Sequence, residues 1–153
     1  DLINKYLKKN FDIFIKIDIQ GYGLDILKSL LYFIERKKII GIEVESSLYA
    51  DPVYENASKF SEISQFLEKN GFELINLKVI NLKKNTENYK YLPNECDAVF
   101  SLKQDQFKEK SISSKINLIC FYNCYKLYDE IKNFYSSNKD LKEALSQKKL
   151  TND

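Results

Sequence analysis

The stretch "FIKIDIQGYGLDILKSLL", residues 14–31, decides the fold, because two periodicities meet in it at a pair of glycines. An apolar residue stands at every second position over residues 11–19, which is the period of a β-strand that buries one face. Beyond Gly21 and Gly23, leucine and isoleucine recur at helical spacing as far as Ile34, which predicts an amphipathic helix of about four turns. The sequence therefore predicts a strand, a tight turn and a helix in succession.

Strands and helices continue to alternate beyond this stretch. "KIIGIEVESS" from Lys38 predicts a second strand, and the helix after it has a C-terminal stop at Asn70 and Gly71. "GFELINLKVINL" and "CDAVFSL" predict two further strands. This order is typical of an α/β fold with right-handed crossovers and a parallel sheet covered on both faces, in which the last two strands form an antiparallel pair. A long helix is predicted from Ser111 onward, followed by a short one over "KDLKEALSQKKL".

The composition describes an ordinary globular domain. A length of 153 residues suits one compact domain, and 44% hydrophobic residues can supply its core. The 24 Lys and Arg residues nearly balance the 22 Asp and Glu residues, for a net charge of +2, and the cations are spread along the chain. Bidentate contacts to phosphate or guanine are made by arginine, and Arg36 is the only arginine of the chain. The composition therefore gives no support to nucleic-acid binding.

No apolar run approaches the roughly 20 residues that cross a bilayer, and the first residues, "DLINKYLKKNFD", lack the apolar region of a signal peptide. We therefore expect a cytoplasmic protein with no membrane partner. The chain has no histidine, which argues against a zinc site and the usual catalytic triads, so no metal is predicted. Cys120 and Cys124 are four residues apart, a helical spacing, and with Cys96 they are predicted to be small apolar side chains in a reducing compartment.

Polar residues follow the first two predicted strands at the point where each strand ends. Asp18 and Gln20 end the first strand, and Glu45, with the two serines after it, ends the second. Ligands of open parallel sheets bind beyond the carboxyl ends of the strands, so these side chains are predicted to face one crevice. Gly21 and Gly23 are weak additional signals, because a strand-to-helix turn often needs a glycine without any ligand.

Two more charges lie behind these residues on the same predicted faces. Lys16 is one pleat behind Asp18, and Glu43 is one pleat behind Glu45. If helices cover this face, an unpaired ammonium would be costly, so Lys16 is predicted to lie within salt-bridge distance of Asp18, Glu43 or Glu45. In the alternative interpretation the face is open to water, and all four charges are ordinary solvated side chains.

Three segments carry a resemblance to a known family: "FIKIDIQGYGLDILKSL", then "IIGIEVESSLYADPVYENASKFSEISQFLEKNGFELINL", then "ECDAVFSL". In this order they resemble the C-terminal half of the FkbM family of methyltransferases, over roughly residues 1–103. The most specific element is "KID" followed by an amide residue, a glycine and the helix. The resemblance implies a partial Rossmann-like methyltransferase sheet, here its fourth to seventh strands. It also implies that the protein binds S-adenosylmethionine and methylates a hydroxyl group of a sugar, a glycan or a secondary metabolite.

Two departures from the family pattern bear on this expectation. Family members generally carry an acidic residue two positions after the glycine, and here that position is Gly23. The family's first strand and its glycine-rich cofactor loop would precede Asp1, and a chain without methionine is expected to be a piece of a longer protein. We therefore expect this chain alone to be inactive and to bind S-adenosylmethionine weakly.

By analogy with the family, Asp18, Ile19, Gln20 and Gly21 are the residues of this chain predicted to contact S-adenosylmethionine. Asp18 is predicted to accept the proton of the acceptor hydroxyl, while Gln20 or Glu45 orients that hydroxyl. No metal is required, because transfer of a sulfonium methyl needs alignment and, at most, a base. The competing role for Asp18 is a structural one, in fixing the turn.

The predicted division places the C-terminal half of the methyltransferase domain at residues 1–105 and a helical extension at residues 106–153.

Two loops with tyrosines, "LYADPVYENAS" and "KKNTENYKYLPNE", are candidate walls of the pocket for a small-molecule or glycan acceptor, or else exposed polar loops. Self-association could use the C-terminal helix or the open edge of the first strand. The alternative function is a non-catalytic binding or scaffolding module that keeps the methyltransferase sheet.

Overall fold

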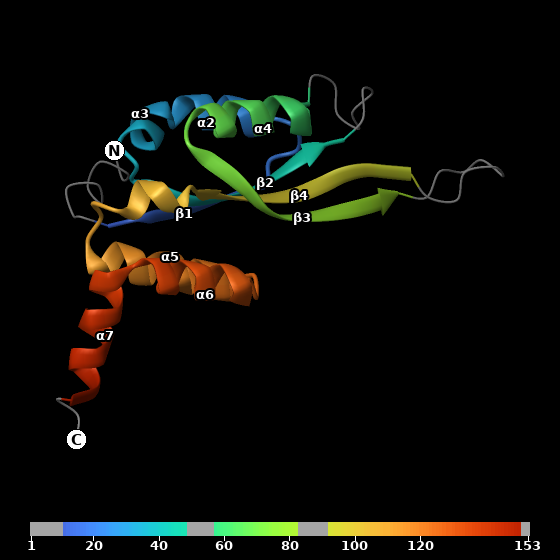
Figure 1. Cartoon of the computed structure of the whole chain (residues 1–153). Helices are drawn as coiled ribbons and strands as arrows, with labels where there is room; N and C mark the ends of the chain where they lie inside the picture. Colours follow the sequence, from blue (N-terminus) through green and yellow to red (C-terminus); the bar gives the residue numbers. More distant parts are fainter. Residues whose placement is uncertain (1–10, 49–56, 83–91, 151–153) are drawn as a thin grey trace. The chain divides into compact units, whose positions relative to one another are not determined.

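The computed structural model describes residues 11–48, 57–82 and 92–150 (Figure 1). The chain divides into two compact units. One is Ile13–Leu102, which holds the sheet, and the other combines Lys103–Asp153 with Asp1–Asp12. The predicted domains, residues 1–105 and 106–153, stay a prediction.

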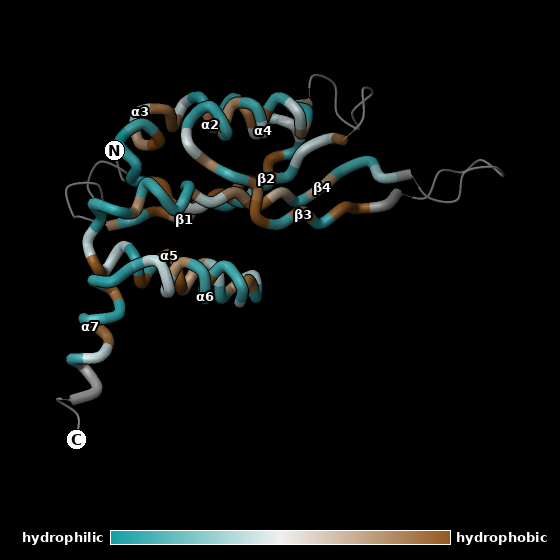
Figure 2. Tube along the Cα trace, in the orientation of Figure 1, coloured by the Kyte–Doolittle hydropathy of each residue, from teal (hydrophilic) through white to brown (hydrophobic). Residues whose placement is uncertain are grey.

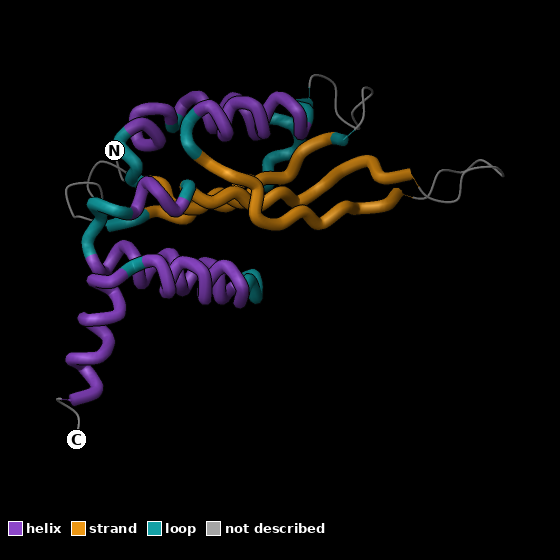
Figure 3. The backbone as a smooth tube through the Cα atoms, viewed as in Figure 1, coloured by secondary structure: helices purple, strands orange, loops and turns teal. Residues whose placement is uncertain are grey.

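Among the described residues, the sheet of the first unit has four strands in the order β1-β2-β4-β3 (Figure 3). They are β1 (Ile13–Ile17), β2 (Ile39–Ser47), β3 (Phe72–Leu82) and β4 (Leu92–Leu102). β1 and β2 are parallel, and β3 and β4 are antiparallel, so both predicted pairings are confirmed. The sheet as a whole is mixed, because β4 lies between β2 and β3 and is antiparallel to both.

The described helices of this unit lie on one face of the sheet (Figure 1). They are α2 (Gly23–Ser29), α3 (Leu31–Glu35) and α4 (Phe60–Lys69). The sequence predicted a sheet covered on both faces, and this stays a prediction. The placement of these three helices on one face follows from the direction of winding. From β1 to β2 to β3 the chain moves across the sheet in one direction, so right-handed crossovers place every helix on the same side.

The single helix predicted in the first crossover is two helices, because the backbone bends at Leu30 (φ −93°, ψ 3°). Leu27 and Ile34, on either side of the bend, are both buried. The predicted stop of α4 is confirmed, since Asn70 is its C-terminal cap and Gly71 has the left-handed φ of +85° that favours glycine.

The core of this unit forms between the sheet and the helices. Hydrophobic positions (brown in Figure 2) alternate with hydrophilic ones along the strands, as the strand period requires. The fully buried apolar side chains of the unit include Leu27, Ile34, Ile40, Ile42, Val44, Ile63, Leu67, Phe72 and Phe100. Removing this apolar surface from water stabilises the unit and holds α2 and α4 against the sheet.

The second unit is helical in its described residues: η1 (Gln104–Phe107), α5 (Ile112–Cys124), α6 (Tyr128–Ser137) and α7 (Lys139–Leu150). The predicted long helix is two helices, because the chain turns between α5 and α6, where Lys126 has a φ of +58°. Ser111 caps α5, its hydroxyl accepting a hydrogen bond from a backbone N–H of the first turn (3.2 Å). Cys120 and Cys124 are exposed on α5, so the predicted role of a buried apolar side chain fits only Cys96 of β4.

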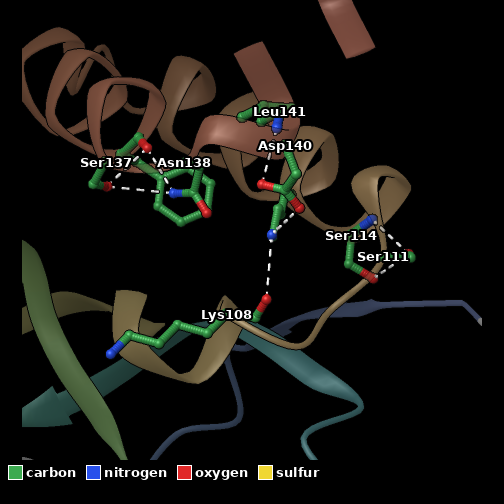
Figure 4. Close-up of polar contacts among 9 residues, drawn as sticks. Lys108, Ser111, Ser114, Ser137, Asn138, Asp140 and Leu141 are labelled. Carbon is green, nitrogen blue, oxygen red and sulfur yellow. Dashed lines mark hydrogen bonds and ion pairs between the residues drawn. The ribbon is translucent and has the colours of Figure 1, made fainter. Parts of the chain in front are cut away.

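A buried lysine fixes α7 to α5 inside the second unit. Only 2% of the Lys115 side chain is exposed. Its ammonium donates to a carboxylate oxygen of Asp140 at the start of α7 (2.5 Å) and to the carbonyl of Lys108 (3.3 Å) (Figure 4). The hydrogen bond and the charge of Lys115 lower the pKa of Asp140. Because a buried ammonium without a partner is costly, α7 is held where its carboxylate meets Lys115.

Candidate functional site

The turn between β1 and α2 carries most of the predicted site residues. Asp18 follows β1 directly, and the turn after it is closed by a hydrogen bond from the N–H of Tyr22 to the carbonyl of Ile19 (3.1 Å). Gln20 (φ +34°) and Gly21 (φ +103°) have left-handed backbone conformations, which are strained for a residue with a side chain such as Gln20. Strain of this kind concentrates at functional sites and persists only where the surroundings hold it.

The contacts that hold this turn come from Ser58, in the segment between β2 and α4. The N–H and the hydroxyl of Ser58 both donate to the carbonyl of Gly21 (2.7 and 2.8 Å). The hydroxyl also accepts a hydrogen bond from the N–H of Leu24 in α2 (3.1 Å). The same segment is tied to the end of β2, where the N–H of Ser47 donates to the carbonyl of Ser58 (3.3 Å). Ser58 therefore links the turn after β1 to the end of β2.

Lys16 pairs with Glu43, one of its three predicted partners. Its ammonium lies 2.8 Å from Oε1 of Glu43, directly across the parallel pair of β1 and β2. The hydrogen bond and the charge of Glu43 raise the pKa of Lys16, and the charges of Asp18 and Asp97 add smaller effects. The predicted salt bridge is confirmed. Lys16 is 60% exposed, however, so this is a surface pair that contributes little to stability.

Asp18 and Glu45 lie close enough to interact, at the ends of the two parallel strands. The pKa of Glu45 is raised, first by burial, then by the negative charge of Asp18, and in smaller measure by a hydrogen bond to Asp18. The two carboxylates therefore lie together at the strand ends, and a ligand crevice at this place stays a prediction. Ile19 and Gln20 are exposed in the turn beside them.

Two acidic residues of β4 that the sequence analysis missed join this pair. Asp97 lies directly opposite Glu45 in the antiparallel pairing of β2 and β4, and Glu95 lies opposite Ser47. The charges of both also raise the pKa of Glu45. Lys78 of β3 lies 3.7 Å from Asp97. The alternation in "NECDAVFSL" places Glu95 and Asp97 on one face of a strand, but it does not reveal which strand lies beside that face.

Gly23 departs from the family pattern for a reason of packing. A Cβ at this position would lie 2.9 Å from Cγ2 of Val44, 3.3 Å from Cδ1 of Ile63 and 3.5 Å from the carbonyl oxygen of Glu45. Since real Cβ atoms essentially never approach another atom within 3.0 Å, only glycine lets α2 lie this close to β2. The packing excludes the acidic residue that family members generally carry here.

Glu45→Gln is expected to make the protein more stable at neutral pH. The folded-state pKa of Glu45 is raised above the ordinary value of 4.5, so the folded protein binds this proton more tightly than the unfolded chain. The stability that this proton contributes is fully present below the ordinary pKa and is lost as the pH rises through the raised value.

Melting temperatures measured at several pH values check this expectation. The variant should melt above the unaltered protein at about pH 7, and the difference should disappear near pH 4. Glu35→Gln, at an exposed position of α3, is the matched control and should show no such trend. A difference that does not change with pH would contradict the prediction.

Within residues 11–48, 57–82 and 92–150, no group of three or more His, Cys, Asp and Glu side chains is arranged to hold a metal ion. In the same ranges, none of the helices combines the length and the apolar character that a membrane span needs. Most of the two candidate acceptor loops, residues 49–56 and 83–91, lies outside the described residues.

Residues 1–74 match the family model described as "Methyltransferase FkbM domain". The match confirms the family resemblance seen in the sequence, and its range includes β1, the turn, β2 and Ser58. No curated protein and no solved structure matches the chain significantly. The family match supports methyltransferase activity in general.

Proposed function

Residues 1–74 match the FkbM methyltransferase domain, and from this premise we propose that the protein transfers a methyl group from S-adenosylmethionine to a hydroxyl group. The acceptor class implied by the family resemblance is a sugar, a glycan or a secondary metabolite. β1 to β4 then correspond to the fourth to seventh strands of a Rossmann-like methyltransferase sheet. The parallel pair β1–β2 and the antiparallel pair β3–β4 support this correspondence.

The observation that carries the proposal is the pair of carboxylates at the ends of the parallel strands. A hydroxyl group loses its proton when it is methylated, and a base takes up that proton best when its pKa lies near the working pH. Burial and the charge of Asp18 raise the pKa of Glu45 in that direction. Because the two groups interact, the role of base belongs to the Asp18–Glu45 pair rather than to one member. This assignment keeps Asp18 as a base and moves Glu45 from orienting the hydroxyl to sharing its proton.

S-adenosylmethionine fits the chemistry of this site. Its sulfonium and α-ammonium groups are both cationic, and Asp18, Glu45, Glu95 and Asp97 make the surface around the strand ends acidic. The turn residues 18–21 would hold the cofactor, as the family resemblance implies. When bound, S-adenosylmethionine supplies the methyl group. The carboxylates of the chain would hold the acceptor hydroxyl and take its proton, and Gln20 would orient that hydroxyl.

Isothermal titration of S-adenosylmethionine tests the proposal. It is carried out on residues 1–153 alone and on a form extended upstream of Asp1. We expect residues 1–153 alone to bind S-adenosylmethionine weakly and the extended form to bind it with higher affinity. In the form that binds, Asp18→Asn should weaken the affinity about tenfold, because it removes a charged partner of the cationic cofactor.

Asp25→Asn is the matched control, because Asp25 is an exposed acidic residue in the first turn of α2, and it should leave the affinity unchanged. Tight binding that is insensitive to Asp18→Asn would show that the site lies elsewhere. Binding by neither form would favour the non-catalytic scaffolding module.

A further inference from the structure

The turn between β1 and α2 depends on a residue outside both elements. The first N–H groups of a helix lack intrahelical partners, and a Ser, Thr, Asp or Asn just before the helix normally accepts a hydrogen bond from one of them. In α2 that place is occupied by Tyr22, whose side chain makes no such bond. The hydroxyl of Ser58 accepts from the N–H of Leu24 instead (3.1 Å). Ser58 therefore caps α2 from a distant part of the chain.

The same residue holds the other side of the turn. The N–H and the hydroxyl of Ser58 donate to the carbonyl of Gly21 (2.7 and 2.8 Å), directly after the left-handed residue Gln20. Ser58 is only 8% exposed, so water competes little for these hydrogen bonds. Without the hydroxyl, Gln20 would lose one of the contacts that keep its backbone in an unfavourable conformation.

We infer that Ser58 is a positioning residue of the candidate site, which keeps the Gln20–Gly21 turn in the conformation that presents Asp18 at the end of β1. Ser58 acts through the turn. Because its carbonyl accepts from Ser47 at the end of β2, it also connects the ends of the two strands that carry the carboxylate pair. That the turn binds S-adenosylmethionine rests on the proposed function. The capping of α2 by Ser58 rests on the hydrogen bonds alone.

The test compares three variants with the unaltered protein, in the form that binds S-adenosylmethionine. Ser58→Ala removes the hydroxyl, and Ser58→Thr keeps one. The matched control is Ser101→Ala, which removes a fully buried hydroxyl of β4 (0% exposed) that donates to the carbonyl of Leu102 (3.0 Å). For each protein, amide hydrogen exchange at Leu24, the melting temperature and the dissociation constant for S-adenosylmethionine are measured.

We expect Ser58→Ala to speed exchange at Leu24 about tenfold and to weaken S-adenosylmethionine binding about tenfold, which is the loss equivalent to one strong helix cap. Ser58→Thr should restore both quantities, and Ser101→Ala should lower the melting temperature while leaving both unchanged. Unchanged exchange at Leu24 in Ser58→Ala would overturn the inference. So would an affinity that falls equally in Ser58→Ala and Ser101→Ala. If neither residues 1–153 nor the form extended upstream binds S-adenosylmethionine, the proposed function fails, and exchange at Leu24 alone decides the inference.

Discussion

In the form extended upstream of Asp1, the Asp18→Asn/Glu45→Gln double variant is expected to transfer methyl groups about 10² to 10⁴ times more slowly than the same form without substitutions. This is the usual contribution of a general base. The two carboxylates interact, and burial together with the charge of Asp18 raises the pKa of Glu45. In a coupled pair, either group can take the proton when the other is replaced, so each single variant should lose less than the double variant. The rate is measured as radiolabelled methyl groups moved from S-adenosylmethionine to a panel of sugar and glycan acceptors.

The pH dependence of this rate separates a base from a structural carboxylate. The rate of the unaltered protein should fall as the pH falls through the raised pKa of Glu45, and the residual rate of the double variant should lack this inflection. Glu43→Gln is the matched control, because Glu43 lies on the same strand but pairs with Lys16 (2.8 Å), and this variant should keep nearly the full rate. A double variant that keeps the full rate or the inflection would contradict the assignment of the base.

Gly23→Glu, which introduces the acidic residue typical of the family, is expected to destabilise the fold by about 3 to 5 kcal/mol. Gly23→Ala should cost about 1 to 3 kcal/mol, the usual effect of overpacking. In both variants the new Cβ would meet Cγ2 of Val44 at 2.9 Å, and glutamate would also place a charge in buried surroundings. The higher helix propensity of alanine, worth about 1 kcal/mol, offsets only part of the clash. The free energy of unfolding in urea measures these losses.

A double-mutant cycle identifies the clash as the cause. Val44→Ala removes the methyl group that the new Cβ would meet, so Gly23→Ala/Val44→Ala should lose less stability than the sum of the two single variants. Asp25→Ala, at an exposed position on the same helix, is the control and should change the free energy of unfolding by less than about 0.5 kcal/mol. If Gly23→Glu is as stable as the unaltered protein, α2 does not need its close approach to β2.

Local patterns in the sequence were enough to predict several features of the first unit. The alternation over residues 11–19 predicted β1, and Asn70-Gly71 predicted the end of α4. The positions of the charges on two adjacent parallel strands predicted that Lys16 pairs with Asp18, Glu43 or Glu45, and Glu43 is its partner. Each of these features depends on the period of one strand or helix or on the strand next to it. Such local patterns can be read directly from the amino-acid sequence.

The sequence by itself determined which segments form strands and helices, apart from the helix breaks at Leu30 and Lys126, and which strand ends carry carboxylates. Only the tertiary structure decided that β4 lies between β2 and β3, because either order of strands satisfies the same alternation. That choice brings Asp97 opposite Glu45 and contributes to the raised pKa of Glu45. The tertiary structure also decided the role of Ser58, whose hydroxyl bonds to Gly21, a residue 37 positions away. A serine in a polar loop has no local signal for such a contact, since the partner is set by how the strands and helices pack in space.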